Sequence, residues 1–153
     1  MKIVEVTGEN VSQAGRIHSE SWKESHRALC SPEFVEKHTP SAQAAFLRRE
    51  MESGKKCYML LDGDPVGIVS VAGNTIENLY VLPQEQRRGY GTALLRFAVS
   101  RCMSGAVLWV LNTNDGARRL YRRFGFAETG KQTRLNDKMY EIEMALPKAK
   151  EEF

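Results

Sequence analysis

The fold of this chain of 153 residues is decided by Gln86-Arg87-Arg88-Gly89-Tyr90-Gly91, a short segment rich in arginine and glycine. It follows the apolar run Leu79-Tyr80-Val81-Leu82-Pro83 and leads into Thr92-Ala93-Leu94-Leu95, so the order is strand, turn and helix. Gly89 and Gly91 have no Cβ atom, so backbone N–H groups can approach a ligand closely at this turn. The first N–H groups of a helix lack partners within it, and the helix dipole adds positive potential there. The segment is therefore either a tight connection or a pyrophosphate site.

Two other phosphate-binding motifs do not fit this turn. A dinucleotide fingerprint requires a third glycine where this chain has Leu94, and an acidic residue about 20 positions further on. After Gly91 the chain has no acid until Asp115. A P-loop requires Gly-x-x-x-x-Gly-Lys-Ser/Thr, and the chain contains no such run.

The residues around the turn resemble the acyl-CoA-binding motif of the GNAT superfamily of N-acyltransferases. That motif is Gln-x-x-Gly-x-Gly after a strand that ends in Tyr-Val-x-Pro, as in the segment from Tyr80 to Gly91. The segment from Asn114 to Phe126 is similar to a second signature of the family, Asn-x-x-Ala-x-x-Leu-Tyr-x-x-x-Gly-Phe. The resemblance covers residues 1–146, and its specific part is 76–126.

The resemblance implies an α/β fold with a mixed, mostly antiparallel sheet of about six or seven strands and about four flanking helices. It implies a single domain over residues 1–146, followed by a charged tail over 147–153. In this fold two central strands splay apart, here 76–82 and 106–111, and the pantetheine arm of the cofactor lies between them.

Hydrophobic periodicity and turn residues predict the individual elements. Strands are expected over residues 2–7, 57–61, 66–72, 76–82, 106–111, 126–130 and 138–145. Helices are expected over residues 10–25, from Ser31, over 41–53 and 91–103, and from Asn114 or Asp115 to Gly125. Pro40 is expected to break the chain, and residues 131–138 to form a loop that borders the acceptor pocket.

The net charge of +3 is unevenly distributed along the chain. From Gln86 to Phe124 there are eight arginines and one acid, so this segment carries +7 and the remainder −4. Most of these arginines are expected on solvated helix faces, but the excess also attracts an anion such as coenzyme A. Nucleic acid suits the sequence less well, because the pI of 8.8 is modest and no basic motif contains interleaved aromatic residues.

Other features indicate a cytoplasmic protein without a metal. No run of 18 apolar residues predicts a membrane span, and the N-terminus lacks the apolar core of a signal peptide. Cys30, Cys57 and Cys102 fit no Cys-x-x-Cys pattern and are expected to be reduced thiols. The histidines form no constellation with carboxylates or thiols, so they are expected to be exposed or hydrogen-bonded.

Acyl transfer from a thioester to an amine needs proton removal, a polarised carbonyl, a stabilised thiolate and aligned reactants. The resemblance assigns the carbonyl to a backbone N–H near Leu79 to Val81 and the pyrophosphate to the N–H groups of residues 87–92. The expected cofactor contacts are Leu79, Tyr80, Val81, Gln86, Arg87, Arg88, Gly89, Tyr90, Gly91, Thr92 and Asn114. Asn114 either contacts the cofactor or caps the helix that follows it.

Three side chains are candidates for catalysis or acceptor binding. Tyr121 matches the motif tyrosine and is the candidate general acid for the thiolate, or else a core aromatic. Glu77 is the candidate general base, acting directly or through water, or else a solvated sheet residue. Strand alternation places it on the same face as Leu79 and Val81. Trp22 lines the acceptor site or anchors the core.

The function expected from the resemblance is acetyl-CoA-dependent N-acetylation of a primary amine, by direct attack in a ternary complex. The alternatives are a non-catalytic acyl-CoA-binding or sensing domain and an arginine-rich nucleic-acid-binding domain. The acceptor is a small-molecule or peptide amine whose identity stays open among polyamine, aminoglycoside, amino acid and protein N-terminus. The chain is a monomer or a homodimer, as dimers are common in the family.

Overall fold

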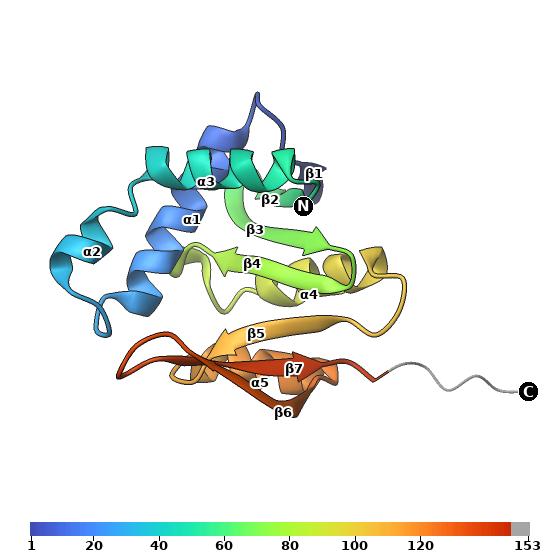
Figure 1. Ribbon diagram of the computed structural model, residues 1–153. Coiled ribbons are helices and arrows are strands. Elements are labelled where there is room, and N and C mark those ends of the chain that lie inside the picture. Colours follow the sequence, from blue (N-terminus) through green and yellow to red (C-terminus); the bar gives the residue numbers. More distant parts are fainter. Residues whose placement is uncertain (148–153) are drawn as a thin grey trace, which may run out of the picture.

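A seven-stranded sheet forms the centre of the protein, as Figure 1 shows for the computed structural model, which describes residues 1–147. In spatial order its strands are β1 (Lys2–Glu5), β2 (Lys56–Asp62), β3 (Asp64–Ala72), β4 (Thr75–Val81), β5 (Val107–Leu111), β7 (Tyr140–Ala145) and β6 (Ala127–Arg134). Neighbouring strands are antiparallel except for β4 and β5, which are parallel. The expected mixed, mostly antiparallel sheet is confirmed. Most of the expected charged tail, residues 148–153, lies outside the described residues.

Helices cover the two faces of this sheet unequally. They are α1 (Val11–His26), α2 (Pro32–Glu36), α3 (Pro40–Glu52), α4 (Tyr90–Arg101) and α5 (Asp115–Phe124), with a short 3-10 helix η1 (Pro83–Glu85). One core cluster joins α1 and α3 to β2 and β3, and a second joins α4 and α5 to β3, β4, β5 and β7. In Figure 1, α1 and α3 lie over the β1–β4 half of the sheet and leave β5, β7 and β6 bare on that face.

The contact between α1 and α3 depends on Gly15. A Cβ atom at this position would lie 2.7 Å from the backbone nitrogen of Ala44 in α3, closer than van der Waals radii allow. Only glycine therefore lets the two helices cross so closely. Pro40 separates α2 from α3 and begins α3, one residue before the expected start. In this first turn the side chain of Thr39 accepts a hydrogen bond from the N–H of Ala42.

The central strands splay apart as expected. Within the described residues β4 and β5 pair only at Thr75 with Val107 and at Ile76 with Leu108, and they diverge beyond those residues. From Glu77 onward the backbone N–H and C=O groups on the β5-facing edge of β4 have no strand partner in this part of the structure. Because such groups need hydrogen-bond partners, an extended part of a ligand can pair with this edge.

A β-bulge in β4 overturns the expected position of Glu77. Glu77 pairs with Ser70, and Tyr80 pairs with Ile68. Between these pairs β4 has two residues where β3 has one, and Asn78, one of the two, adopts a left-handed backbone with φ of 52°. The extra residue breaks the alternation. Glu77 therefore shares its face with Asn78 and Tyr80, toward α1 and α3, and not with Leu79 and Val81, which pack against the core on the α4 side.

The end of the chain differs from the expected loop. β6 continues to Arg134, so the expectation of a loop starting at residue 131 was wrong. Every residue of this edge strand is exposed, and the register shifts between Glu128 and Gln132 around Gly130, whose φ is 94°. With neither face buried, the sequence has no hydrophobic alternation from which the strand could be predicted.

Candidate active site

An open cleft of about 880 Å³ runs from the glycine-bearing turn along β4 to the C-terminal half of α1. Its walls include eleven residues that the sequence singled out: Leu79, Tyr80, Val81, Gln86, Arg87, Gly89, Tyr90, Gly91, Thr92, Asn114 and Tyr121. Of the described residues predicted for the site, Arg88, Glu77 and Trp22 lie outside this lining. The fold thus brings both sequence motifs to one surface.

The turn before α4 presents backbone N–H groups to the cleft. Gly89 caps the helix with a left-handed backbone, φ 84°, that a residue with a Cβ atom adopts only at a cost. Tyr90, Gly91 and Thr92 follow in the first turn, where backbone N–H groups have no intrahelical partner. The N-terminus of α4 therefore offers an anion-binding end at the mouth of the cleft.

The arginines near this turn divide into two groups. Arg88 forms an ion pair with Glu85 at 3.2 Å, and Arg118 and Arg122 both bind Glu128, at 2.9 and 2.8 Å. The arginines that line the cleft are Arg87, Arg119 and Arg123. Sequence reasoning did not separate these groups, although Arg119 and Arg123 are four residues apart and so share one side of α5.

The C-terminal end of β4 is fixed by contacts from two other segments. The carbonyl oxygen of Val81 accepts hydrogen bonds from Ser21 Oγ of α1 at 3.2 Å and from Gln86 Nε2 at 3.3 Å. With Ser25 and Glu24, Ser21 forms the α1 wall of the cleft, which the sequence did not indicate. Gln86 therefore holds the turn against the strand as well as lining the cleft.

Two motif residues of the α5 region occupy positions that suit either of their predicted roles. Asn114 Oδ1 accepts a hydrogen bond from the N–H of Ala117 at 3.2 Å, so this residue caps α5 while it lines the cleft. The Tyr121 side chain is 6% exposed and also lines the cleft. Burial raises the pKa of Tyr121, so its hydroxyl keeps its proton at neutral pH.

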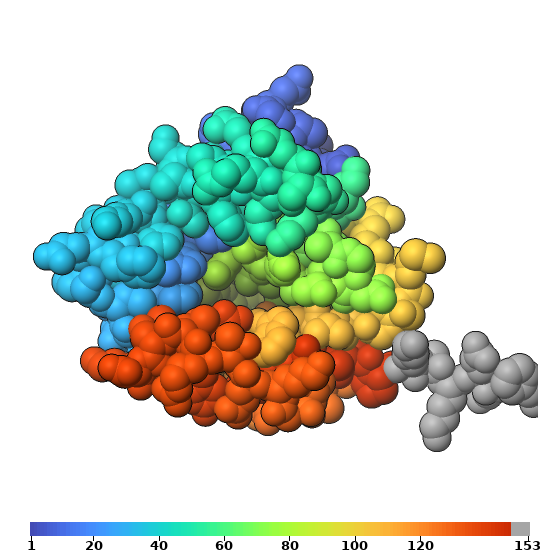
Figure 2. All heavy atoms as spheres, viewed as in Figure 1, coloured from blue at the N-terminus to red at the C-terminus, as the bar shows by residue number. Residues whose placement is uncertain are grey.

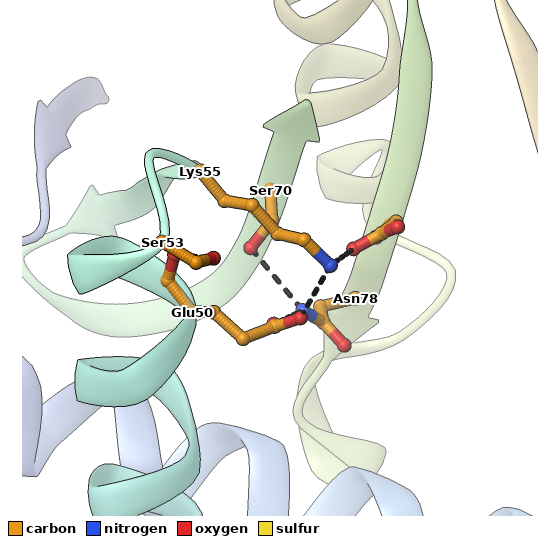
Figure 3. Close-up of polar contacts among 6 residues, drawn as sticks. Glu50, Ser53, Lys55, Ser70 and Asn78 are labelled. Atoms are coloured by element: carbon orange, nitrogen blue, oxygen red, sulfur yellow. Dashed lines mark hydrogen bonds and ion pairs between the residues drawn. The ribbon is translucent and has the colours of Figure 1, made fainter. Parts of the chain in front are cut away.

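Glu77 binds Lys55 in a polar cluster on the other face of β4, in which Figure 3 labels Glu50, Ser53, Lys55, Ser70 and Asn78. Lys55 Nζ lies 2.8 Å from a carboxylate oxygen of Glu77 and 2.8 Å from one of Glu50 in α3. The side chain of the bulge residue, Asn78, donates to Glu50 at 2.8 Å and to Ser70 Oγ at 3.3 Å. The hydrogen bonds to Glu50 and Glu77 raise the pKa of Lys55, so the cluster keeps one ammonium between two carboxylates.

The aromatic residues of α1 form a separate group near the same face. Trp22 is half-buried and stacks between the rings of His26 and His38, with centroids 4.0 and 3.4 Å away. His18 is buried, its Nδ1 lies 2.9 Å from Gln43 Nε2, and burial lowers its pKa to about 4. Across residues 1–147 no three His, Cys, Asp or Glu side chains converge as a metal site would require.

A hollow opens beside these groups on the face shown in Figure 2. It lies between the blue α1–α2 region, the teal α3 and the orange-red β6–β7 region, with green β4 at its floor. Tyr80 reaches this side of the sheet, where its ring lies edge-on to His18 at 4.9 Å. Because Tyr80 also lines the cleft, the cleft and the hollow meet at β4.

No helix within residues 1–147 combines the length and the apolar character that crossing a membrane demands.

Comparisons with known proteins agree with this geometry. The model of the acetyltransferase (GNAT) family matches residues 19–126, which is more than half of the chain. Three similar solved structures are the PaiA N-acetyltransferase of Thermoplasma acidophilum in complex with coenzyme A, the ribosomal-protein-S18-alanine N-acetyltransferase of Escherichia coli, and yncA, a putative acetyltransferase of Salmonella typhimurium with its cofactor acetyl-CoA.

These three structures share the fold along nearly their whole length. The TM-scores are 0.69, 0.71 and 0.69 at identities of 18%, 21% and 18%, in the same order. The matches cover 97%, 99% and 100% of this chain and 98%, 96% and 96% of the other chains. With both motifs on one cleft and a family match over most of its length, the chain belongs to the GNAT acetyltransferase family.

Proposed function

We propose that this protein transfers an acetyl group from acetyl-CoA to a primary amine, by direct attack within a ternary complex. The observation that carries the proposal is the continuity of the cleft, which joins the N-terminus of α4 to the edge of β4 left open by the splay. A pyrophosphate fits the first site and an extended amide-containing arm fits the second. Coenzyme A carries both groups, and two structural neighbours hold coenzyme A or acetyl-CoA.

In this proposal the backbone N–H groups of residues 87–92 hold the pyrophosphate. An N–H of the β4 segment from Leu79 to Val81 polarises the thioester carbonyl, since donors aimed at a developing oxyanion stabilise the transition state. The amine nitrogen forms a bond to the acetyl carbon, and the carbon–sulfur bond breaks. The leaving thiolate takes a proton from the Tyr121 hydroxyl, and the proton that the nitrogen loses on becoming an amide returns through water to the Tyr121 oxygen.

The ammonium form of the acceptor must lose a proton before it attacks. Glu77 is the proposed base, and its ion pair with Lys55 favours transfer through an intervening water rather than direct contact. Trp22, stacked between two imidazole rings next to the α1 residues that line the cleft, is a proposed acceptor contact. The acceptor is a small-molecule or peptide amine.

Calorimetric titration with acetyl-CoA, and separately with CoA, tests the cofactor. Thiol release across a panel of amines then tests turnover. Tyr121→Phe should lower the turnover rate by about 100-fold, the lower range for loss of a general acid, while acetyl-CoA affinity stays unchanged. Tyr58→Phe is the matched control, because this ring packs against Phe97 away from the cleft lining. Binding without turnover of any amine would favour the non-catalytic acyl-CoA-binding domain instead.

A further inference from the structure

Glu141 of β7 lies on the face of the sheet that is turned away from the core beside α4. In the sheet it lies opposite Leu111 of β5 and Thr133 of β6. Ile142 and Met144, which alternate with Glu141 and Glu143 along β7, are buried in the core beside α4, so strand alternation turns the two glutamates to the opposite face. On that face α1 and α3 leave β5, β7 and β6 bare, and the hollow of Figure 2 lies there.

The Glu141 carboxylate has no partner although it is half-buried. Within residues 1–147 neither a hydrogen bond nor an ion pair engages its oxygens, and burial raises the pKa of Glu141. Three other carboxylates toward this face do have partners: Glu143 accepts from Thr129 Oγ1 at 2.8 Å, and Glu77 and Glu50 both bind Lys55. A half-buried charge without a partner is unfavourable, so the position is one that a cationic ligand would stabilise.

Glu141 also lies near the inner end of the cofactor cleft. In the sheet Glu141 lies opposite Leu111, and Thr113 and Asn114, two and three residues after Leu111, line the cleft. Besides burial, the charge of Glu141 raises the pKa of Tyr80, which also lines the cleft. The register of β7 therefore places the carboxylate beside the cleft wall that follows β5.

We propose that Glu141 binds the ammonium group of the acceptor and thereby selects cationic amines, an inference that rests on the proposed acetyltransferase function. The arginines Arg87, Arg119 and Arg123 line the cofactor cleft together with Glu24 and Glu85. The carboxylates of Glu77, Glu141 and Glu143 lie on the other face of β4 and β7, where the acceptor is proposed to bind. Glu141 stays a carboxylate throughout, and the proton of the ammonium leaves to the separate base.

The test compares the wild type with Glu141→Gln, which keeps the side-chain volume and removes the charge. The acceptors are four cationic amines: 1,4-diaminobutane, spermidine, lysinamide and a tripeptide with N-terminal alanine. For the amine that the wild type uses best, Glu141→Gln should raise KM by about tenfold or more, because a charge-assisted contact is lost. The kcat of Glu141→Gln should stay within about threefold of the wild-type value. Glu141→Asp keeps the charge, so its KM should lie between those of the wild type and Glu141→Gln.

Two controls separate this role from a structural one. Glu143→Gln changes a neighbouring carboxylate that Thr129 already holds, and its KM should match the wild type. The melting temperature of Glu141→Gln should not fall, because the substitution removes an unpaired charge and no contact.

The outcomes are distinguishable. If the wild type does not bind acetyl-CoA, the proposed function itself fails. If it binds acetyl-CoA but acetylates none of the four amines, or if Glu141→Gln leaves the KM unchanged, the role of Glu141 is wrong while the cofactor assignment stands. A KM increase shared equally by Glu143→Gln would likewise overturn the specific role of Glu141.

Discussion

The Nζ atom of Lys55 lies 2.8 Å from a carboxylate oxygen of Glu77, at the point where β4 bulges. The same ammonium is 2.8 Å from Glu50, whose other oxygen accepts a hydrogen bond from the bulge residue Asn78. The ion pair thus connects the proposed base, through Glu50, to the bulge residue of β4. A change at either end should affect the reaction more than the overall fold, since the side chains involved are partly exposed.

Glu77→Gln should lower the acetylation rate and alter its pH profile, because the substitution removes the only proton-accepting function of the side chain. Acetyl-CoA affinity should be unchanged, since Glu77 lies outside the lining of the cofactor cleft. Turnover against pH, measured beside calorimetric titration, checks both statements. Glu5→Gln is a matched control that breaks a comparable ion pair with Lys56, 3.0 Å long, between the edge strand β1 and β2. An unchanged pH profile in Glu77→Gln would remove this residue from the mechanism.

Two substitutions separate the helix-capping role of Asn114 from its proposed contact with the cofactor. Asn114→Ala should cost about 1 kcal/mol of unfolding free energy, because the N–H of Ala117 loses its acceptor. Asn114→Ser keeps an oxygen for that N–H and should lose less than about 0.5 kcal/mol. Acetyl-CoA affinity should fall in both, because each removes the amide that lines the cleft. Urea unfolding and calorimetry measure the two effects; full affinity in Asn114→Ser would leave Asn114 as a cap alone.

The local parts of this site could be predicted from the sequence. Gly89 and Asn114 act within a few residues of their own positions, through backbone conformation and capping. Helix periodicity and turn residues are likewise local, and the expected elements lie within a few residues of those observed, apart from the C-terminal part of β6. The family resemblance then supplied the splay, which no local pattern encodes.

The remaining features depend on contacts between distant segments. The bulge at Asn78 is held by Glu50, 28 residues earlier, so strand alternation alone placed Glu77 on the wrong face. The position of Glu141 depends on its register with Leu111, set when β7 adds to the sheet beside β5. A single sequence does not specify either pairing, because many registers satisfy the same hydrophobic pattern on an open face.

Gly89→Ala should weaken acetyl-CoA binding by about tenfold, because a left-handed backbone costs an L-residue about 1–2 kcal/mol and the turn would shift to relieve it. The φ of Gly89 is 84°, and the residues that follow it, Tyr90 and Gly91, line the cleft. Gly130→Ala is the matched control, since Gly130 has φ of 94° and open space around it in β6. Both variants should lose similar thermal stability, but only Gly89→Ala should lose affinity. Equal affinities would show that the conformation of the turn does not matter for the cofactor.

The stability of the fold should decrease as the pH falls below neutrality, because His18 is buried. Burial lowers the pKa of His18 from 6.5 to about 4, so the unfolded chain binds its proton more readily than the folded protein between these values. The contribution of His18 to the free energy of unfolding is fully present above pH 6.5 and is lost as the pH falls toward 4. At pH 5 the loss should be about 2 kcal/mol relative to pH 7.

Urea unfolding of the wild type and of His18→Asn at both pH values isolates this contribution. The variant loses ring contacts with Tyr80 and Phe46, so it should be less stable at each pH. Its loss between pH 7 and pH 5 should nevertheless be smaller than that of the wild type by about 2 kcal/mol, since asparagine does not titrate. If His18→Asn and the wild type lose the same free energy, His18 is not the group that senses the proton.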